Sequence, residues 1–453
     1  MKNVHDLVIL GGGPAGYFAA ERAADAGLRA LLLEERALGG VCLNEGCIPT
    51  KAFLHSAKLA ASAMKGEEYG VLAENVWLDH EKVLKYKNIV VQKLVGGVAA
   101  TLKKKQVDAI RAKGVIKGRT EGGFAVEANG ESYESERLLI CTGSEVIVPK
   151  IKGLDKALKS GFVITSRECL DLESVPERFV IVGGGVIGLE VANYFAIAGS
   201  DVTVIEMLPE VGGSIDADIA ANIRTNLEKL GVKFMLGARA EEFSKDGVLV
   251  SGSETVPADK VLLSIGRKPR VADSGFETLG LYVDKGALIT DSRMRTNVPG
   301  VWAAGDVNGK SMLAHTAYRE AAVSIDDMVS GKGTMKYSAI PQVIYTSPEA
   351  ACVGETERTA AEKGYIFYKA VLPLMYSGRY MAENASGDGF VKAIVCRNTG
   401  RILGLHMAGT YASEIALTMA MLVGSKWSAE AAKKIIYPHP SVGEIIRDVL
   451  LEI

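Results

Sequence analysis

Short apolar runs along the chain stop abruptly at glycine, and helical patterns follow two of them. The runs and their turns are Leu7–Leu10 with Gly11-Gly12-Gly13-Pro14-Ala15-Gly16, Phe179–Val182 with Gly183-Gly184-Gly185-Val186-Ile187-Gly188, and Val301–Ala304 with Gly305-Asp306. After the first two turns, helical patterns continue to Ala26 and Ala198. A short apolar run bounded by glycine indicates a buried strand, so the pattern predicts strand–turn–helix units.

The first two units form an internal repeat. After each helix comes a second apolar strand, Ala30–Leu33 or Val202–Ile205, and each of these stops at an acid, Glu34 or Glu206. A glycine pattern that follows a strand, opens a helix and has an acid about 20 residues on is the full signature of dinucleotide binding. Two such units predict two dinucleotides, and FAD with NAD or NADP is the combination that we expect.

The glycines of each loop have separate expected roles. The first makes the tight turn, the second lets a pyrophosphate approach the backbone, and the third lets helix and strand pack closely. In order, these glycines are Gly11, Gly13 and Gly16 in one unit and Gly183, Gly185 and Gly188 in the other. The helix N-terminus then holds the anion. For either unit alone, a glycine-rich turn without a ligand is the alternative.

Glu206 bears on the choice between NAD and NADP. A carboxylate at this position accepts from a 2′-hydroxyl and repels a 2′-phosphate. Residues 207–211 supply no arginine or lysine that could reverse this preference. The sequence therefore predicts NAD.

Outside the two strand–turn–helix units, the chain has other hydrophobic patterns. Residues 114–136 have the pattern of short β-rich segments with turns, outside the parallel sheet. After Gly331 the pattern predicts a separate α+β domain. Its expected elements are strands over 340–353, 365–372, 389–395 and 403–407, and a long apolar helix over 413–423. The expected fold class is α/β, with two Rossmann-like dinucleotide-binding domains followed by this α+β domain.

Charge and hydropathy exclude several classes of partner. The chain has 453 residues and a net charge of −2, so no general attraction to nucleic acid or anionic membrane is expected. No apolar run reaches the roughly 18 residues of a membrane span. The N-terminal apolar run is short and enters the first glycine motif directly, unlike a signal peptide. We expect a cytoplasmic location, no nucleic acid and no membrane.

Two of the six cysteines, Cys42 and Cys47, lie close together. In an ideal helix their α-carbons would be about 8–9 Å apart, whereas a disulfide tolerates up to about 6.8 Å. A bonded pair therefore needs distorted helix, for which Gly39, Gly40 and Gly46 are suited. A metal site or two unconnected buried thiols are the alternatives, but the remaining cysteines are scattered. We favour a redox dithiol near the first dinucleotide and no metal site.

Residues 39–51 resemble the active-site segment of the pyridine nucleotide–disulfide oxidoreductases, and the resemblance covers the chain in order. Within that family, several motifs resemble the dihydrolipoamide dehydrogenases more than glutathione reductase. They are Leu43-Asn44, Ile48-Pro49 with Lys51, Met312-Leu313-Ala314-His315 and Tyr345-Thr346-Ser347-Pro348-Glu349.

The resemblance implies roles for individual residues. Cys42 would exchange with the substrate sulfur, and Cys47 would lie nearest the flavin, with Lys51 close by and paired with Glu190. FAD would contact Gly11, Gly13, Gly16, Glu34, Lys51, Gly114, Thr142, Gly143, Ser144, Asp306, Met312, Leu313, Ala314 and His315. NAD would contact Gly183, Gly185, Gly188, Glu190, Glu206, Ala240 and Gly266.

His439 stands between Pro438 and Pro440, and Glu444 follows shortly after it. Thiol exchange needs a thiolate, and histidine is the base best matched to that task near neutral pH. Read alone, the segment could equally be a rigid surface turn. The resemblance implies that His439 is the catalytic base, oriented by Glu444, and that the pair serves the other subunit of a homodimer.

Four residues depart from the commoner family pattern: Glu45, Tyr437, Ser441 and Gly443. Glu45 places an acid between the cysteines, which should raise the pKa of a neighbouring thiol. These departures leave the mechanism intact but bear on the choice of partner.

The resemblance implies a dihydrolipoamide dehydrogenase that reduces NAD⁺ through FAD. Its partner would be a lipoylated carrier protein or the acyltransferase subunit of a 2-oxoacid dehydrogenase, acetoin or glycine-cleavage system. The implied domains are 1–145 and 269–333 for FAD, 146–268 for NAD and 334–453 for the dimer interface. The alternatives are another FAD- and NAD(P)H-dependent disulfide reductase, an NADH oxidase or a non-enzymatic redox sensor.

Overall fold

The computed structural model describes residues 4–252 and 255–453, which fall into two compact units. The first unit contains the chain up to Ala52, Leu84–Val148 and Gly266–Lys336. The second contains Phe53–Val83, Pro149–Ile265 and Tyr337–Ile453. The finer division into FAD, NAD and dimer-interface domains stays a prediction.

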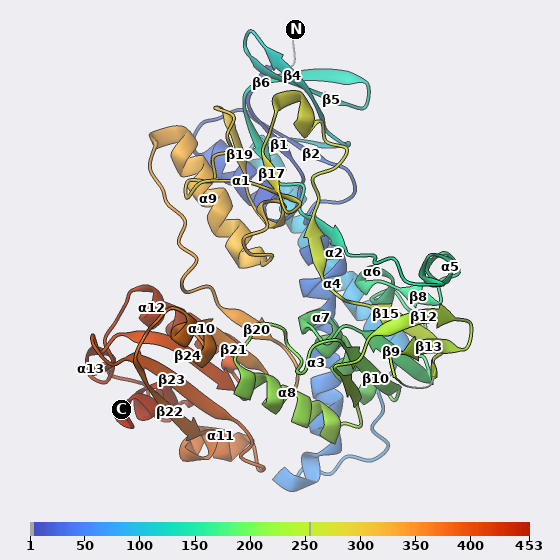
Figure 1. The fold of residues 1–453 in the computed structure, drawn as a ribbon, viewed down its shortest axis with the longest axis vertical. Coiled ribbons are helices and arrows are strands. Elements are labelled where there is room, and N and C mark those ends of the chain that lie inside the picture. Colours follow the sequence, from blue (N-terminus) through green and yellow to red (C-terminus); the bar gives the residue numbers. More distant parts are fainter. Residues whose placement is uncertain (1–3, 253–254) are drawn as a thin grey trace. The chain divides into compact units, whose positions relative to one another are not determined.

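The first unit is built on a seven-stranded sheet (Figure 1). Its parallel strands are β3 (Asp108–Arg111), β2 (Ala30–Glu34), β1 (Val4–Leu10), β6 (Glu131–Ile140) and β19 (Val301–Ala303). Leu7 to Leu10 are at most 2% exposed. This continuous burial explains the unbroken apolar run, because a parallel strand is covered on both faces. Helices α1 (Pro14–Asp25) and α9 (Ala314–Ser330) pack against each other in this unit.

The expectation that residues 114–136 lie outside the parallel sheet is wrong in part. Strands β4 (Val115–Thr120) and β5 (Gly123–Ala128) form an antiparallel hairpin, but β5 also pairs with β6. Residues 134 and 135 of β6 are themselves parallel partners of β1. The hairpin is therefore an edge of the main sheet, because β6 continues past it into the core.

Smaller elements complete the first unit. They are α2 (Gly40–Glu45), β7 (Ser144–Val146) paired with β16 (Arg267–Pro269), and β17 (Val283–Asp284) paired with β18 (Ala287–Leu288). Two long helices, α3 (Cys47–Met64) and α4 (His80–Lys104), have residues in both units. No helix among the described residues has the length and apolar character required to cross a bilayer.

The second unit begins with the other half of the repeat. A five-stranded parallel sheet has the order β11 (Lys233–Leu236), β10 (Asp201–Glu206), β9 (Arg178–Val182), β15 (Lys260–Leu263) and β8 (Val163–Ile164). Its helices are α5 (Leu154–Lys159), α6 (Ser166–Cys169), α7 (Val186–Ile197) and α8 (Ala217–Lys229). A small antiparallel sheet contains β12 (Ala240–Ser244), β13 (Gly247–Val250) and β14 (Thr255–Pro257).

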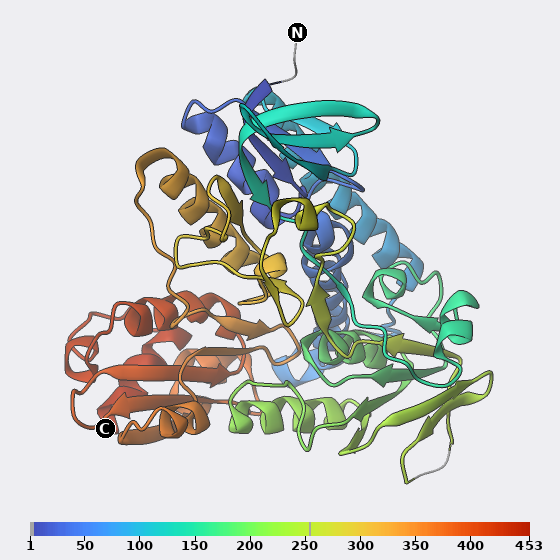
Figure 2. The ribbon, with the colours of Figure 1, turned by 45° about the horizontal axis from the view of Figure 1, so that its top comes forward.

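The C-terminal part of the second unit is the predicted α+β arrangement. Its antiparallel strands, coloured orange to red in Figure 2, are β20 (Gln342–Ile344), β21 (Ala350–Gly354), β24 (Ile402–Ala408), β23 (Phe390–Cys396) and β22 (Phe367–Pro373). The helices are α10 (Glu357–Glu362), α11 (Gly378–Glu383), α12 (Ala412–Gly424), α13 (Ala429–Ala432) and α14 (Ile445–Leu451). Residues of α12 and α14 share one apolar core with the sheet.

One expected strand of this domain is wrong. The apolar pattern predicts a single strand over 340–353, but residues 345–349 separate β20 from β21. The backbone N–H of Tyr345 instead donates to the carboxylate of Glu190, and that of Ser347 donates to the side-chain oxygen of Asn193. These contacts with α7 replace the ladder hydrogen bonds of the segment.

A buried ion-pair cluster lies within the second unit. Nζ of Lys392 on β23 is 2.8 Å from Oδ1 of Asp216, and the two side chains are 1% and 2% exposed. Asp216 also caps α8 by accepting from the backbone N–H of residues 218 and 219. Asp218 and Glu357 also contact Nζ of Lys392, the latter at 2.9 Å. Lys392 therefore joins the α8 N-terminus to the C-terminal sheet.

Candidate functional site: two dinucleotide loops, a dithiol and a histidine–glutamate pair

The backbone of the first glycine loop packs so closely against its neighbours that a side chain would clash at two positions. Gly11 has φ +103°, and a Cβ there would lie 2.2 Å from the carbonyl oxygen of Cys141. A Cβ on Gly16 would lie 1.8 Å from the oxygen of Gly11. Glu34, at the end of β2, accepts from the backbone N–H of Gly12 at 2.6 Å. This open helix N-terminus, with a carboxylate beside it, fits a dinucleotide pyrophosphate and ribose.

The second loop has the same construction. A Cβ on Gly188 would lie 2.1 Å from the oxygen of Gly183, while the position above Gly185 has no atom within 4 Å. Glu206 accepts from the N–H groups of Gly184 at 2.6 Å and Leu208 at 2.8 Å. The predicted repeat is therefore a repeat in three dimensions, including the position of the acid. This loop also fits a dinucleotide.

The cysteine pair lies at a break between two helices. Cys42 lies in α2, Cys47 begins α3, and Gly46 between them ends the first helix. Both are half-buried free thiols, and their side chains are hydrogen-bonded to each other. The predicted distortion is confirmed, because the helix is interrupted where the pair needs to approach.

The dithiol segment rests directly on the first dinucleotide loop. Gly40 has φ +56°, and a Cβ there would lie 2.7 Å from Cα of Gly13. The backbone N–H of Gly39 donates to the carbonyl of Gly12 at 2.8 Å. The residues just before Cys42 are therefore in backbone contact with the loop that would hold a pyrophosphate.

The environment of Cys42 disfavours its thiolate in this reduced state. The hydrogen bond with Cys47 and burial raise the pKa of Cys42, while the positive charge of Lys51 lowers it less strongly. The sequence predicted that Glu45 would raise the thiol pKa. The largest influences are instead Cys47, burial and Lys51, and Glu45 is held by Arg36 at 3.0 and 2.8 Å.

Two tyrosines beside the dithiol were not found from the sequence. The hydroxyls of Tyr17 on α1 and Tyr318 on α9 are hydrogen-bonded, and their ring centroids are 5.9 Å apart. Burial raises the pKa of Tyr17, and further increases come from Tyr318 and from the charge of Cys42. Tyr17 directly follows the last glycine of the loop motif, which is the one signal that could have drawn attention to it.

A polar chain connects several of the predicted FAD residues. Ser144 donates to Asp306 at 2.5 Å and accepts from Nε of Arg267 at 2.7 Å. Burial raises the pKa of Asp306, although the Ser144 hydrogen bond and the charge of Arg267 act in the opposite direction. The Thr142 hydroxyl donates to the carbonyl of Arg270 at 2.7 Å. Arg267 and Arg270 were not predicted in this cluster.

The remaining FAD candidates lie in the same unit. Gly114 allows close packing, because a Cβ there would be 2.6 Å from Leu10 and 2.8 Å from Leu33. Gly143 has φ +71°, which suits its turn. Met312 and Leu313 precede α9, Ala314 begins it, and His315 is exposed.

The NAD candidates divide between the units. Glu190 is a buried residue of α7, and Ala240 begins β12. Both belong to the second unit, whereas Gly266 and Lys51 belong to the first. The expected pairing of Lys51 with Glu190 and the convergence of Gly266 on NAD stay predictions.

His439 and Glu444 meet as predicted. Nδ1 of the histidine is 3.1 Å from each carboxylate oxygen, with the histidine side chain 77% exposed and the glutamate 7%. Burial raises the pKa of Glu444, but hydrogen bonds from His439 and Ser441 and the charge of Arg447 outweigh it. The pKa of this carboxyl is therefore below its ordinary value. The ring is held at one nitrogen, and its other nitrogen projects from an exposed side chain.

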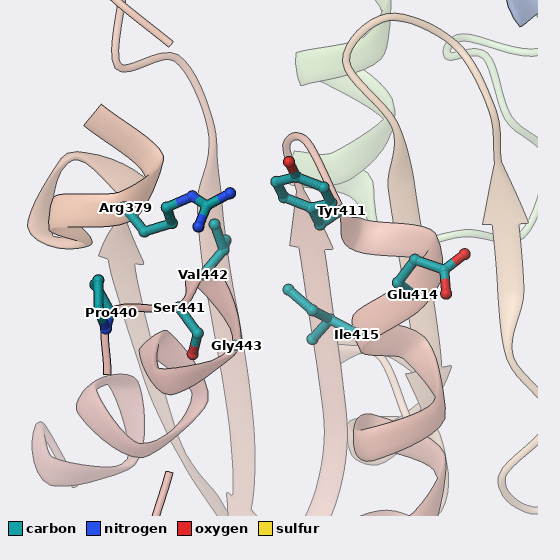
Figure 3. Close-up of a pocket in the computed structure, with 8 residues that line it drawn as sticks. All are labelled: Arg379, Tyr411, Glu414, Ile415, Pro440, Ser441, Val442 and Gly443. Atoms are coloured by element: carbon teal, nitrogen blue, oxygen red, sulfur yellow. The ribbon is translucent and has the colours of Figure 1, made fainter. Parts of the chain in front are cut away.

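The departures from the family pattern have structural roles. The Tyr437 hydroxyl donates to the carbonyl of Ala432 at 3.4 Å, and the ring packs against the C-terminal core. Ser441 caps the turn that ends at Glu444. A cavity of about 250 Å³ adjoins this segment (Figure 3). Its lining residues are Arg379, Tyr411, Glu414, Ile415, Pro440, Ser441, Val442 and Gly443.

Two family models together match most of the chain. The model for "Pyridine nucleotide-disulphide oxidoreductase" matches residues 5–321. The model for the dimerisation domain of the same group matches residues 340–450.

Individual proteins are similar over the same extent. Dihydrolipoyl dehydrogenase of Mycoplasma genitalium is 34% identical, with 98% of this chain and 97% of that protein covered. Dihydrolipoyl dehydrogenase of Thermus scotoductus is 36% identical, with 97% and 95% covered. Among solved structures, the HOCl-induced flavoprotein disulfide reductase RclA from Escherichia coli has a TM-score of 0.86 at 29% identity, with 98% and 99% covered.

Proposed function

Because the chain belongs to the pyridine nucleotide-disulphide oxidoreductase family, whose members use FAD and NAD, we propose that it is a dihydrolipoyl dehydrogenase. It would oxidise dihydrolipoamide on a carrier protein to lipoamide and reduce NAD⁺ to NADH. Relatives of that name align over nearly the whole chain at 34–36% identity, which supports this substrate over others.

The observation that carries the proposal is the position of the dithiol. Cys42 and Cys47 are hydrogen-bonded to each other at a helix break. The backbone just before them touches the first dinucleotide loop at Gly13. A substrate dithiol can exchange with a disulfide formed at this place, and the electron pair then needs to travel only a short distance to the dinucleotide.

The two cysteines have different proposed tasks. In the oxidised protein, a thiolate of dihydrolipoamide attacks Cys42 and releases Cys47, giving a mixed disulfide. The second substrate thiol then displaces Cys42, which completes lipoamide and leaves the protein as a dithiol. Lys51 favours the thiolate form of Cys42 by its charge. Bound FAD supplies the route by which the electron pair passes from Cys47 to NAD⁺ as hydride.

His439 is the proposed base. The substrate thiol attacks a disulfide only as a thiolate. A base near Cys42 therefore has to accept the proton of the substrate thiol. Glu444 holds Nδ1 of the ring and leaves Nε2 for the proton. In the homodimer that the dimerisation-domain match supports, we propose that the partner subunit's His439 serves Cys42.

The residues proposed to hold FAD share one unit. They comprise Gly11, Gly13, Gly16, Glu34, Lys51, Gly114, Thr142, Gly143, Ser144, Asp306, Met312, Leu313, Ala314 and His315.

For NAD we propose Gly183, Gly185, Gly188, Glu190, Glu206, Ala240 and Gly266. Glu206 supports NAD over NADP, because a carboxylate repels a 2′-phosphate. Comparable turnover with NADPH at low concentration would refute that preference.

Cys47→Ser tests the proposal directly. The variant should keep its yellow flavin, because Cys47 is not part of the loop that holds the dinucleotide. It should lose dihydrolipoamide turnover and the long-wavelength absorption band of the two-electron-reduced protein. Cys169→Ser is the matched control, since this buried thiol lies in the second unit. Retained turnover in Cys47→Ser would exclude the dithiol mechanism.

A second candidate is another disulfide reductase of the family. It is supported by the structural likeness to RclA, an HOCl-induced flavoprotein disulfide reductase. Steady-state rates with dihydrolipoamide, glutathione and a lipoylated carrier domain separate the two candidates. Oxygen uptake with NADH tests for an oxidase. Two further statements stay predictions. One is that the enzyme serves a complex through a lipoylated carrier or acyltransferase subunit, and the other is a cytoplasmic location.

A further inference from the structure

Arg36 and Glu45 form a two-pronged ion pair across the helix that carries Cys42. Nη1 of Arg36 is 3.0 Å from one carboxylate oxygen of Glu45, and Nη2 is 2.8 Å from the other. The Glu45 side chain is only 11% exposed. Glu45 is the last residue of α2, directly before the break at Gly46. The pair therefore ties the end of α2 back to the turn that precedes the helix.

That turn is itself anchored to the first dinucleotide loop. The backbone N–H of Arg36 donates to Oε1 of Glu34 at 2.7 Å. The other oxygen of Glu34 accepts from Gly12 at 2.6 Å. One short stretch of chain thus joins the ribose acid, the Arg36 guanidinium and the dithiol helix. A second contact stabilises the helix, because the Asn44 amide donates to the carbonyls of Leu38 and Gly40.

Glu45 and Cys42 are neighbours on the same short helix. Cys42 and Glu45 are three residues apart on α2, and residues at this spacing are neighbours on a helix face. A mostly buried carboxylate from which a bidentate guanidinium has been removed disfavours a nearby anion more strongly. A bidentate guanidinium is the side chain best shaped to neutralise it.

We propose that Arg36 and Glu45 are a positioning pair for the redox dithiol. The ion pair fixes the end of α2 at the helix break and cancels a carboxylate charge that opposes the Cys42 thiolate. The inference rests on the proposed function of the dithiol and adds two residues to it. Neither residue contacts the reacting sulfurs as a catalyst.

Other charged and titratable groups also face Cys42, and they set the background for the pair. From α3 these are Cys47 and Lys51. From α1 and α9 they are Tyr17 and Tyr318, whose pKa values are raised first by burial and further by the charge of Cys42. A test therefore has to change only Arg36 and Glu45 and leave these four in place.

The test is the pH dependence of Cys42 alkylation. The flavin-loaded protein is reduced anaerobically with one equivalent of NADH and treated with iodoacetamide, and the modified residue is located by mass spectrometry. Arg36→Met removes the bidentate guanidinium from Glu45, so the apparent pKa of alkylation should rise by about one unit. Glu45→Gln leaves the arginine charge uncompensated, so the pKa should fall. The double variant should return to the value of the unaltered protein.

The opposite signs separate this role from a merely structural one, because a loosened helix would change both single variants in the same way. Arg22→Met is the matched control. Its ion pair with Asp326 at 2.8 Å joins α1 and α9, and its loss should not shift the profile. Unchanged profiles in both single variants, or a double variant displaced as far as Arg36→Met, would overturn the proposal. If Arg36→Met does not retain flavin, the sign of the Glu45→Gln shift decides alone.

Failure of this proposal is distinguishable from failure of the proposed function. Alkylation requires only the reduced dithiol and does not depend on dihydrolipoamide turnover. An unaltered protein that does not oxidise dihydrolipoamide refutes the proposed function. Single variants whose alkylation profiles match the unaltered protein refute the positioning pair.

Discussion

Nδ1 of His439 lies 3.1 Å from both carboxylate oxygens of Glu444, so one buried acid fixes the orientation of an exposed imidazole. If the ring is the base, His439→Gln should lower kcat/KM for dihydrolipoamide by about 10²- to 10⁴-fold. Flavin content should not change, because the residue lies outside both glycine loops. Stopped-flow reduction by NADH is the control reaction and should stay close to the unaltered rate. An equal loss in both reactions would contradict the assignment.

Glu444 should also make the fold sensitive to acid. Its folded pKa is lowered, so its charge contributes stability that is fully present above the unfolded pKa. That contribution is lost as the pH falls through the folded pKa. Glu444→Gln should therefore lower the unfolding free energy at neutral pH by about 1–3 kcal/mol. The difference from the unaltered protein should shrink below about pH 4. Thermal melts across this range measure it, and a constant difference would contradict the linkage.

Gly16→Ala should prevent flavin binding. The added Cβ would lie 1.8 Å from the carbonyl oxygen of Gly11, so either the loop or the helix has to move. Purified protein should have little flavin absorbance per chain. Gly96→Ala is the matched control, because no atom lies within 4 Å of its Cβ position in α4. That variant should keep its flavin and gain about 0.5–1 kcal/mol of stability.

Lys392→Met should destabilise the second unit strongly. The substitution leaves Asp216 buried without its main cation, a defect that costs about 3–5 kcal/mol. Lys369→Met is the control, because this lysine pairs with Glu357 while 44% exposed. Its loss should cost at most about 1 kcal/mol. Thermal unfolding of the two flavin-loaded variants compares them, and equal melting temperatures would show that burial of the pair contributes nothing.

The repeated strand–glycine–helix units were predictable because they are local. Apolar runs, glycines and acids lie within one short stretch, and elements β1, α1 and β2 match the predicted ranges within a few residues. The hairpin β4–β5 and the break at residues 345–349 were not predictable in the same way. The hairpin joins the main sheet only because its partner β6 also pairs with the distant strand β1, and the break depends on contacts with α7.

The residues of the candidate site were predictable or not for the same reason. The cysteine pair, the glycines and His439 with Glu444 are visible because each group stands within one motif. Tyr318 is not, because its partner Tyr17 belongs to a helix some 300 residues earlier. Arg36 was not predictable for another reason. Glu45 is recognisable in the sequence as an unusual acid between the cysteines, but the sequence does not show which cation pairs with it.

The approach of Gly40 to Gly13 has a consequence for engineering. Where the two backbones meet, a side chain at position 40 requires the loop to withdraw, because its Cβ would lie 2.7 Å from Cα of Gly13. A designer who grafts a different thiol motif onto this scaffold must therefore transplant the nucleotide turn along with it, as a single cassette.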